Sequence, residues 1–414
     1  MKYIALLLTL LAQLSFAQTL LQPDRVFDGN TMHENWVVVV TDNHISYAGP
    51  QSGASNFKVT KTIDLKGTTL LPGIIEGHSH ILLHPYNETS WNDQVLKESP
   101  AERAIRATNH AKKSLMAGVT TMRDLGSEGA GYTDLYVKKS IESGIIPGPR
   151  LLVAGPAVVA TGAYGPKGFH DGVTVPLGAE TASGVPDCIE TVRRQMGHGI
   201  DVVKIYADYR WSSGAPSQAT FLQSEIDAMV ATAHSAGIPI VAHASTPEGI
   251  LRATNAGVRT IEHGDDGTLE IFKLMKSKEV GLCPTLAAGD AISQYLGWRK
   301  GIDPEPDRIA RKKASFKAAL ESGVQIVFGG DVGVFPHGDN YREMVLMVAY
   351  GMRPLGVLIS ATSGNAKIFD LDNLGQIKSN FLADIIAVQG NPLQDISTMQ
   401  DVTFVMKDGV IYKN

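Results

Sequence analysis

The chain has 414 residues, of which 43% are hydrophobic and 19% are charged, and its formal net charge is −5. This is the composition of an ordinary globular protein, long enough for one large domain and one smaller domain. Because the chain is slightly acidic and has no run of lysine and arginine, we expect neither nucleic acid nor an anionic membrane surface as a partner. With two cysteines, Cys188 and Cys283, disulfides cannot build the fold, and the sequence leaves open whether the two pair.

The first 17 residues are typical of a secretory signal peptide. Lys2 provides a positive charge, an apolar run follows at positions 4–12, and “SFA” at positions 15–17 is a small-x-small cleavage site. The alternative is a buried first helix. The apolar run is too short to span a bilayer, and no cysteine lies at the cleavage site, so we expect no membrane anchor. The sequence therefore predicts a secreted or periplasmic protein.

Short stretches of alternating apolar and polar residues follow, over residues 18–70. They include “TLLQPDRVFDG”, “NWVVVVTDNHISYAG” and “FKVTKTIDLKG”, which predict a small antiparallel sheet. The end of the chain, residues 371–414, returns to short strands and turns. We predict that the two ends of the chain together build one composite β-sandwich domain.

Residues 71–370 repeat a unit in which a helical stretch ends in a glycine and an apolar strand follows. Seven glycines stand where a helix C-cap needs a left-handed residue, namely Gly118, Gly144, Gly199, Gly237, Gly257, Gly281 and Gly323. With “TTLLPGIIEGHSH” as the first strand, eight strands alternate with helices, which is typical of a (β/α)8 TIM barrel. A doubly wound open sheet is the competing architecture, but its glycine-rich phosphate-binding turn is missing after the first strand.

Polar residues mark five of the predicted strands. His78 and His80 end the first strand, where the period of two directs both imidazoles to one face. The others are Lys204 within the fourth strand, His243 at the end of the fifth, His263 at the end of the sixth and Asp331 at the end of the eighth. Each alone could be a hydrogen-bonded polar strand end. In a parallel barrel, however, these ends open on one rim, where active sites lie, and four histidines with one aspartate form a zinc-type ligand set.

Lys204 stands in the otherwise apolar stretch “DVVKIYAD”. Nearby metal ions would repel a protonated lysine and so favour the neutral amine. A neutral amine can take up CO2 and become a carbamate, whose two oxygens can bridge two metal ions. The alternative is an ordinary buried lysine paired with a carboxylate. Tyr206 lies on the same strand face as Lys204, so it is also expected to point into the barrel.

This ligand set, together with “LLPGIIEGHSH”, “AGVTTMRDLG”, “GPRLLVAG” and “ADIIAVQGNPLQDI”, resembles the binuclear branch of the amidohydrolase superfamily over nearly the whole mature chain. The chain is similar to imidazolonepropionase-like and prolidase-like members, including bacterial ochratoxin-degrading amidohydrolases. The resemblance implies two Zn²⁺ ions per chain, bridged by carbamylated Lys204 and a hydroxide. It places the first ion on His78, His80 and Asp331, and the second on His243 and His263.

These observations predict a hydrolase that cleaves the amide bond of dipeptides or N-acyl amino acids with an apolar C-terminal residue, ochratoxin A among them. Asp331 would accept the proton of the attacking hydroxide, and Tyr206 would donate a hydrogen bond to the carbonyl. Related deaminases usually lack the lysine of the fourth strand, so Lys204 favours amide hydrolysis. The alternatives are a cyclic amide or lactone hydrolase on the same metals and, more remotely, a non-enzymatic binding protein. We also expect a homo-oligomer.

The loops that follow the strands contain the candidate substrate-binding residues, namely Trp91, Tyr164, His170, Arg210 and His337. Aromatic side chains suit an apolar group, and a guanidinium can bind a substrate carboxylate through two hydrogen bonds. Packing within the loops is the alternative for the aromatic residues, and a surface position is the alternative for Arg210. In “ATGAYGPKG”, Tyr164 occupies a position where many prolidase-like relatives have a histidine, which argues against a strict preference for X-Pro substrates.

Overall fold

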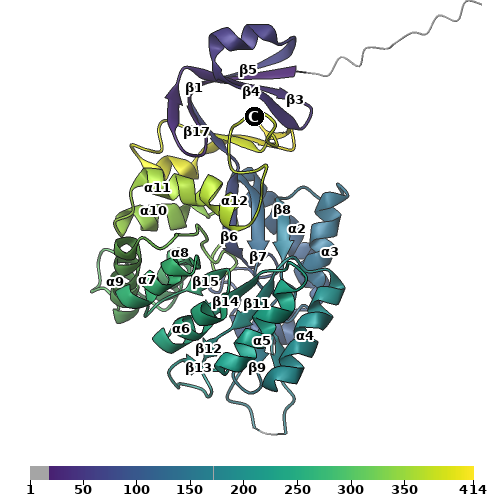
Figure 1. Ribbon diagram of the computed structural model, residues 1–414, viewed down its shortest axis with the longest axis vertical. Helices are drawn as coiled ribbons and strands as arrows, with labels where there is room; N and C mark the ends of the chain where they lie inside the picture. The colour runs from purple at the N-terminus through teal and green to yellow at the C-terminus, as the bar shows by residue number, and fades with distance from the viewer. Residues whose placement is uncertain (1–17, 171) are drawn as a thin grey trace, which may run out of the picture.

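The computed structural model describes residues 18–170 and 172–414. It shows an all-β unit at one end and a larger unit of parallel strands and helices (Figure 1). The predicted signal segment, residues 1–17, lies outside the described residues. In the part of the chain that the structure describes, no helix is long and apolar enough to cross a membrane.

Both ends of the chain contribute strands to the all-β unit (Figure 1). Eight strands form one sheet in the order β19-β18-β17-β5-β1-β3-β4, and β2 pairs with β1. They are β1 (Gln18–Phe27), β2 (Met32–Glu34), β3 (Trp36–Thr41), β4 (His44–Pro50), β5 (Val59–Pro72), β17 (Ile385–Gln389), β18 (Val402–Lys407) and β19 (Val410–Lys413). The sheet is not purely antiparallel as predicted, because β1 and β5 run parallel. The chain makes the hairpin of β3 and β4 along one edge of β1 before it returns along the other edge as β5.

The interior of this unit joins side chains that lie far apart in the sequence. Val38 and Ile63 from the first strands pack in one buried cluster with Ile385 and Phe404 from the last strands. The predicted first barrel strand is divided between two elements, since β5 continues to Pro72 and β6 begins at Ile74. The chain therefore passes from the all-β unit into the larger unit almost without a loop.

The larger unit contains two parallel sheets, with strand orders β6-β7-β8 and β10-β9-β11-β14-β15-β16. Their strands are β6 (Ile74–Ser79), β7 (Val119–Asp124), β8 (Arg150–Val153), β9 (Val158–Ala160), β10 (Glu180–Ala182), β11 (Val203–Tyr206), β14 (Ile240–Ala244), β15 (Thr260–His263) and β16 (Gly281–Cys283). A short hairpin, β12 (Asp208–Tyr209) with β13 (Gln218–Ala219), follows β11.

Helices alternate with these strands and cover them on the outside (Figure 1). They are α1 (Trp91–Lys97), α2 (Pro100–Met116), α3 (Thr133–Glu142), α4 (Gly184–His198), α5 (Gln223–His234), α6 (Pro247–Ala256), α7 (Leu269–Ser277), α8 (Leu286–Tyr295), α9 (Asp307–Ser322), α10 (Tyr341–Ala349), α11 (Pro354–Ile359) and α12 (Asn365–Ile368). The result is an α/β fold in which parallel strands are buried beneath amphipathic helices.

Backbone contacts join the two parallel sheets to each other. The amide of Asp201, just before β11, donates to the carbonyl of Val153 at the end of β8, with an N···O distance of 2.9 Å. Residues 326–332 form isolated parallel bridges to β16 through Ile326 and to β6 through Val332. The predicted eighth strand is thus an irregular segment that contacts both neighbours, and the strand ladder is interrupted on either side of the β6-β7-β8 sheet.

Six of the seven predicted cap glycines have a positive φ, namely Gly118, Gly144, Gly199, Gly237, Gly257 and Gly323. The prediction for Gly281 is wrong, because Gly281 is the first residue of β16 and the left-handed residue of the preceding turn is Glu279, with φ 58°. A side chain at Gly281 would collide with Ile368 of α12. Glycine is therefore needed there for close packing and not for a helix cap.

The two cysteines do not pair. Cys188 in α4 and Cys283 in β16 are both buried with free thiols. They belong to different apolar clusters of the larger unit. Packing and backbone hydrogen bonds hold the fold without a disulfide.

A buried histidine pair lies beneath the loop after β6. His110 of α2 stacks on His337 with ring centroids 4.3 Å apart, and its Nδ1 donates to the carbonyl of Ile81 at 2.8 Å. Burial lowers the pKa of His110 to about 4. A histidine in the unfolded chain has a pKa of about 6.5, so the neutral ring stabilises the fold above that pH. This contribution is lost as the pH falls from 6.5 toward 4.

We expect this one group to lower the free energy of unfolding by about 3 kcal/mol between pH 7 and pH 4, since one pKa unit corresponds to about 1.36 kcal/mol. His110→Asn keeps a donor for the Ile81 carbonyl and should remove that part of the acid sensitivity. Chemical denaturation at several pH values measures it. The control is His234→Gln at an exposed position of α5, and equal pH slopes in His110→Asn and the wild type would contradict the assignment.

Candidate metal centre and its cavity

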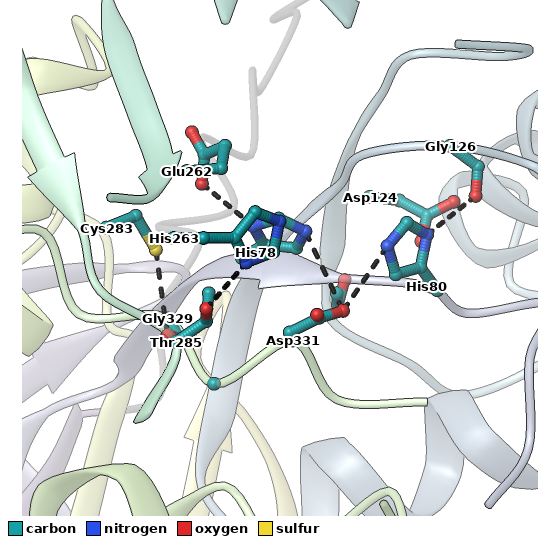
Figure 2. A network of polar contacts seen from close by, with 12 residues as sticks. His78, His80, Asp124, Gly126, Glu262, His263, Cys283, Thr285, Gly329 and Asp331 are labelled. Carbon is teal, nitrogen blue, oxygen red and sulfur yellow. Dashed lines mark hydrogen bonds and ion pairs between the residues drawn. The ribbon is translucent and has the colours of Figure 1, made fainter. Parts of the chain in front are cut away.

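Four histidines and an aspartate converge at the carboxyl ends of β6, β14, β15 and the segment 326–332. The ring centroid of His78 lies 5.4 Å from that of His80 and 5.2 Å from that of His263. The ring centroids of His263 and His243 are 4.5 Å apart. Ligand atoms of His78, His263 and Asp331 lie within 4.8 Å of one another. Residues that are widely separated in the sequence thus form one contiguous group (Figure 2).

Contacts with the protein occupy one nitrogen of each imidazole. Nδ1 of His78 lies 2.8 Å from Glu262 Oε2, Nδ1 of His80 donates to the Gly126 carbonyl at 2.9 Å, and Nδ1 of His263 lies 2.8 Å from Thr285 Oγ1 (Figure 2). In each of these rings Nε2 remains as a possible metal ligand. Such a partner on the second nitrogen fixes both the tautomer and the ring orientation of a metal-binding histidine.

His243 is oriented in the opposite sense. Its Nε2 lies 3.5 Å from Asp208 Oδ1, so Nδ1 is the nitrogen left for a metal. Asp208 is itself held by the backbone amides of Ser245 and Thr246. Burial raises the pKa of Asp208 to about 6.

Asp331 lies beside the histidines, and one of its carboxylate oxygens accepts no hydrogen bond from the described residues. Its Oδ1 is 3.7 Å from Nε2 of His78 and 3.4 Å from Nε2 of His80, but it receives no hydrogen bond from the described residues. Asp331 and His263 also have left-handed backbones, with φ 63° and 77°, a strained conformation that is typical of functional sites. An unpaired buried carboxylate oxygen facing free imidazole nitrogens fits a divalent cation.

Lys204 is fully buried in β11. Among the described residues it has no hydrogen-bond or ion-pair partner, so the alternative of a lysine paired with a carboxylate is not observed. Burial lowers the pKa of Lys204, which favours the neutral amine. Burial, together with the charge of Lys204, lowers the pKa of His243 to about 3. A neutral Lys204 beside neutral imidazoles is the state that carbamylation and metal binding need.

A buried network behind His78 was not predicted. Glu262 contacts His78 through Oε2, and its Oε1 accepts from Arg123 Nη2 at 2.9 Å and from Thr260 Oγ1 at 2.5 Å. Arg123 also donates to the carbonyl of Gly77 at 2.7 Å. The available signal was a charged residue inside each of two apolar strands, in “TTMRDLG” and “TIEHG”, because buried charges are almost always paired.

We expect Glu262→Gln to weaken zinc binding about tenfold to a hundredfold, since it removes the carboxylate that orients His78. The Zn²⁺ dissociation constant, measured by competition with a chromogenic chelator, reports this effect without any substrate. Glu248→Gln is the matched control, because Glu248 makes an exposed ion pair with Arg252 on α6. Equal zinc affinity in Glu262→Gln and the wild type would show that Glu262 does not orient a ligand.

The four histidines and Asp331 lie in the wall of a cavity of about 880 Å³. Trp91, Tyr164, Tyr206 and Tyr209, here called the aromatic cluster, form one side of it. The ring of Tyr164 lies 5.4 Å from that of Trp91, 4.7 Å from Tyr206 and 4.8 Å from Tyr209. Arg210 also lines the cavity, with its guanidinium 5.5 Å from the centre of the Tyr209 ring.

Three of the five predicted substrate-binding residues therefore line the cavity: Trp91, Tyr164 and Arg210. The other two lie elsewhere. His170 is exposed on the loop after β9, and His337 is buried against His110, with its Nε2 donating to the Leu83 carbonyl. A histidine in a loop after a strand can face solvent or the core as readily as the cavity, and the sequence pattern does not distinguish these directions.

Glu128 and α9 also contribute to the cavity, and neither was predicted. Glu128, in the loop after β7, is 3% exposed and accepts hydrogen bonds from Trp91 Nε1 and the Tyr164 hydroxyl, both at 2.8 Å. Arg308, Arg311 and Lys312 of α9 also line the cavity. Arg311 pairs with Asp266, and Lys312 pairs with Asp265.

Parallel strands that end in histidines around one cavity are typical of metal-binding hydrolases with an α/β fold. The model of the Amidohydrolase family matches residues 69–412, and the chain belongs to this family. It is 28% identical to the ochratoxinase of Aspergillus niger over 93% of this chain and 84% of that protein. The crystal structure of that enzyme superposes with a TM-score of 0.80 at 25% identity, covering 96% of each chain. An Xaa-Pro dipeptidase with bound methionine in its active site has a TM-score of 0.84 at 31% identity, covering 96% of this chain and all of that one.

Proposed function

We propose that the protein is a binuclear zinc hydrolase that cleaves the amide bond of dipeptides and N-acyl amino acids with an apolar C-terminal residue. We further propose that the strands of the larger unit form a (β/α)8 barrel and that the enzyme acts outside the cytoplasm. One observation carries the assignment of the site: Asp331 Oδ1, which receives no hydrogen bond from the described residues, lies within 3.7 Å of Nε2 of both His78 and His80, and His263 and His243 continue the same group of imidazoles beside the buried Lys204. The names of two relatives, an ochratoxinase and an Xaa-Pro dipeptidase, support an amide substrate.

The proposed metal ligands divide into two sets. His78, His80 and Asp331 would hold one ion, His243 and His263 would hold the other, and Lys204, as a carbamate, would be shared by both. When bound, the two ions supply a nucleophile at neutral pH, because they lower the pKa of coordinated water to about 7. A set of nitrogen and oxygen ligands suits zinc.

We assign proton transfer to Asp331 and carbonyl binding to Tyr206. Asp331 would accept the proton of the attacking water and pass it to the departing nitrogen. Tyr206 would donate its hydroxyl hydrogen to the carbonyl oxygen. Burial raises the pKa of Tyr206 well above its ordinary value, so the hydroxyl stays protonated. The Tyr206 ring is held by stacking on His243, with centroids 4.5 Å apart and planes 15° apart.

The rest of the cavity wall supports the choice of substrate. The aromatic cluster offers stacking surfaces for an apolar side chain or a flat acyl group. Arg210 has no ion-pair partner among the described residues, so its guanidinium is available for the substrate carboxylate. Tyr164 donates to Glu128 and lies 3.5 Å from the Tyr206 hydroxyl, which fits a wall residue and not a strict proline pocket.

We expect N-acyl-L-phenylalanine compounds, ochratoxin A among them, to be cleaved. The matching N-acyl phenethylamides, which lack the carboxylate, should be cleaved at least about tenfold more slowly, because a charge-assisted hydrogen bond contributes roughly 1.5–3 kcal/mol. The measurement is kcat/KM for both members of such a pair with zinc-loaded protein. Equal values would exclude carboxylate recognition. Faster turnover of lactones or hydantoins in the same assay would instead assign the site to cyclic substrates.

A further inference from the structure

Glu128, in the wall of the cavity, is a carboxylate that forms no ion pair with a lysine or arginine among the described residues. It is 3% exposed, yet both of its recorded side-chain hydrogen bonds go to Oε2, from the neutral donors Trp91 and Tyr164. Among the described residues, one basic nitrogen lies within 4 Å of the Glu128 carboxylate. It is Nδ1 of His80, 3.9 Å from Oε1. That nitrogen already donates to the Gly126 carbonyl. A buried carboxylate normally has a cation opposite it, and here the cavity is the place left for one.

The protein holds Glu128 in a fixed and strained position. Its backbone is left-handed, with φ 49°. Arg103 of α2, 1% exposed, donates Nη1 to the carbonyl of Glu128 at 2.6 Å and Nη2 to the carbonyl of Ser127 at 3.0 Å. The Arg103 guanidinium thus holds the backbone of Glu128 and makes no ion pair with its carboxylate. A strained residue that the surrounding structure fixes in this way is typical of a binding contact.

The position of Glu128 relative to the metal-ligand candidates defines what it can contact. His80 presents Nε2 to Asp331 and Nδ1 toward Glu128, so the carboxylate lies one imidazole away from the reacting centre. In a dipeptide, the α-ammonium group is one carbon atom away from the carbonyl that is attacked. Arg210 lines the same cavity next to Tyr209 and is available for the C-terminal carboxylate. The cavity wall therefore offers one carboxylate and one guanidinium for the two charges of an unblocked dipeptide.

We infer that Glu128 binds the free α-ammonium group of a dipeptide, so that the enzyme prefers unblocked dipeptides to N-acyl amino acids of the same shape. This inference rests on the proposed amide hydrolysis. It makes Glu128 a specificity-determining residue of that reaction. Trp91 and Tyr164 orient its carboxylate by their hydrogen bonds to Oε2.

The test compares L-leucyl-L-phenylalanine with 4-methylpentanoyl-L-phenylalanine, which is the same molecule without its amino group. In the wild type, kcat/KM for the dipeptide should be about tenfold to a hundredfold higher, the range expected for hydrogen bonds to charged groups. Glu128→Gln should lower kcat/KM for the dipeptide by a similar factor and leave the desamino compound within about threefold. Asp266→Asn is the matched control, since Asp266 also lines the cavity but already pairs with Arg311. In this variant, the ratio of kcat/KM for the dipeptide to kcat/KM for the desamino compound should equal that of the wild type.

Equal kcat/KM for the two compounds in the wild type would overturn the inference, and so would an equal loss for both in Glu128→Gln with normal zinc content. A second readout does not depend on turnover. Calorimetric titration of the chelator-treated wild type should show tighter binding of the dipeptide than of the desamino compound, and equal binding would overturn the inference. If neither amide were hydrolysed by the zinc-loaded protein, the proposed function would fail, while this binding comparison would still decide the role of Glu128.

Discussion

Asp331→Ala is expected to lower kcat by about a thousandfold or more while the protein remains folded. The carboxylate has two roles in the proposed mechanism, as a metal ligand and as the group that transfers the proton, and proton transfer alone contributes about 10²- to 10⁴-fold. The substitution should leave the fold intact, because Oδ1 receives no hydrogen bond from the described residues whose loss would destabilise it. Steady-state kinetics on N-acyl-L-phenylalanine, with circular dichroism and elemental analysis of the same samples, measures the effect.

Asp339→Ala provides the control for this variant, since Asp339 lies in the loop before α10 and outside the cavity wall. Its kcat should remain within about threefold of the wild type, as is usual for substitutions away from special features. An Asp331→Ala protein with kcat within tenfold of the wild type and unchanged metal content would exclude Asp331 both as a ligand and as the proton acceptor.

Lys204→Ala is expected to abolish most activity by removing the group that would be shared between the two ions. The variant should bind about one zinc ion fewer per chain, because the remaining histidines alone complete a weaker site. Elemental analysis and kinetics on the same preparation test both effects. Full activity together with full metal content in this variant would rule out a bridging lysine.

Short carboxylic acids should partly restore the activity of Lys204→Ala, since a carboxylate offers the same pair of oxygens as a carbamate and fits the space that the lysine leaves. The matched control is Lys204→Arg, which should not be rescued, because its guanidinium fills that space and cannot bind a metal. The rescue is measured as activity against acetate or propionate concentration in buffer free of bicarbonate. Equal responses in the two variants would show that the acids act elsewhere.

The sequence could identify the metal-ligand candidates because each stands at a position that the local pattern defines. His78 and His80 share a strand face by the period of two, and His243 and His263 each follow an apolar strand. The parallel arrangement of these strands then brings their carboxyl ends together. Asp331 could be found by the same rule, although its segment forms bridges to β6 and β16 and not a regular strand.

Contacts between distant segments could not be predicted in this way. Glu262 contacts His78 and Arg123 across three strands, and nothing in the sequence of any one strand indicates which partner a buried charge will have. The direction in which a loop side chain points also depends on contacts between distant segments. His337 packs on His110 and Trp91 reaches Glu128 because of the tertiary arrangement of α1, α2 and the loops, whereas both were predicted from residue type alone.

We propose that a pair of zinc ions on this residue set drives amide hydrolysis. The most direct test is a titration of chelator-treated protein with Zn²⁺ while the release of phenylalanine from N-acyl-L-phenylalanine is followed. We expect no turnover without metal, a rise as zinc is added, and a plateau at two equivalents per chain. Full turnover by protein from which elemental analysis finds all metal removed would contradict the proposal.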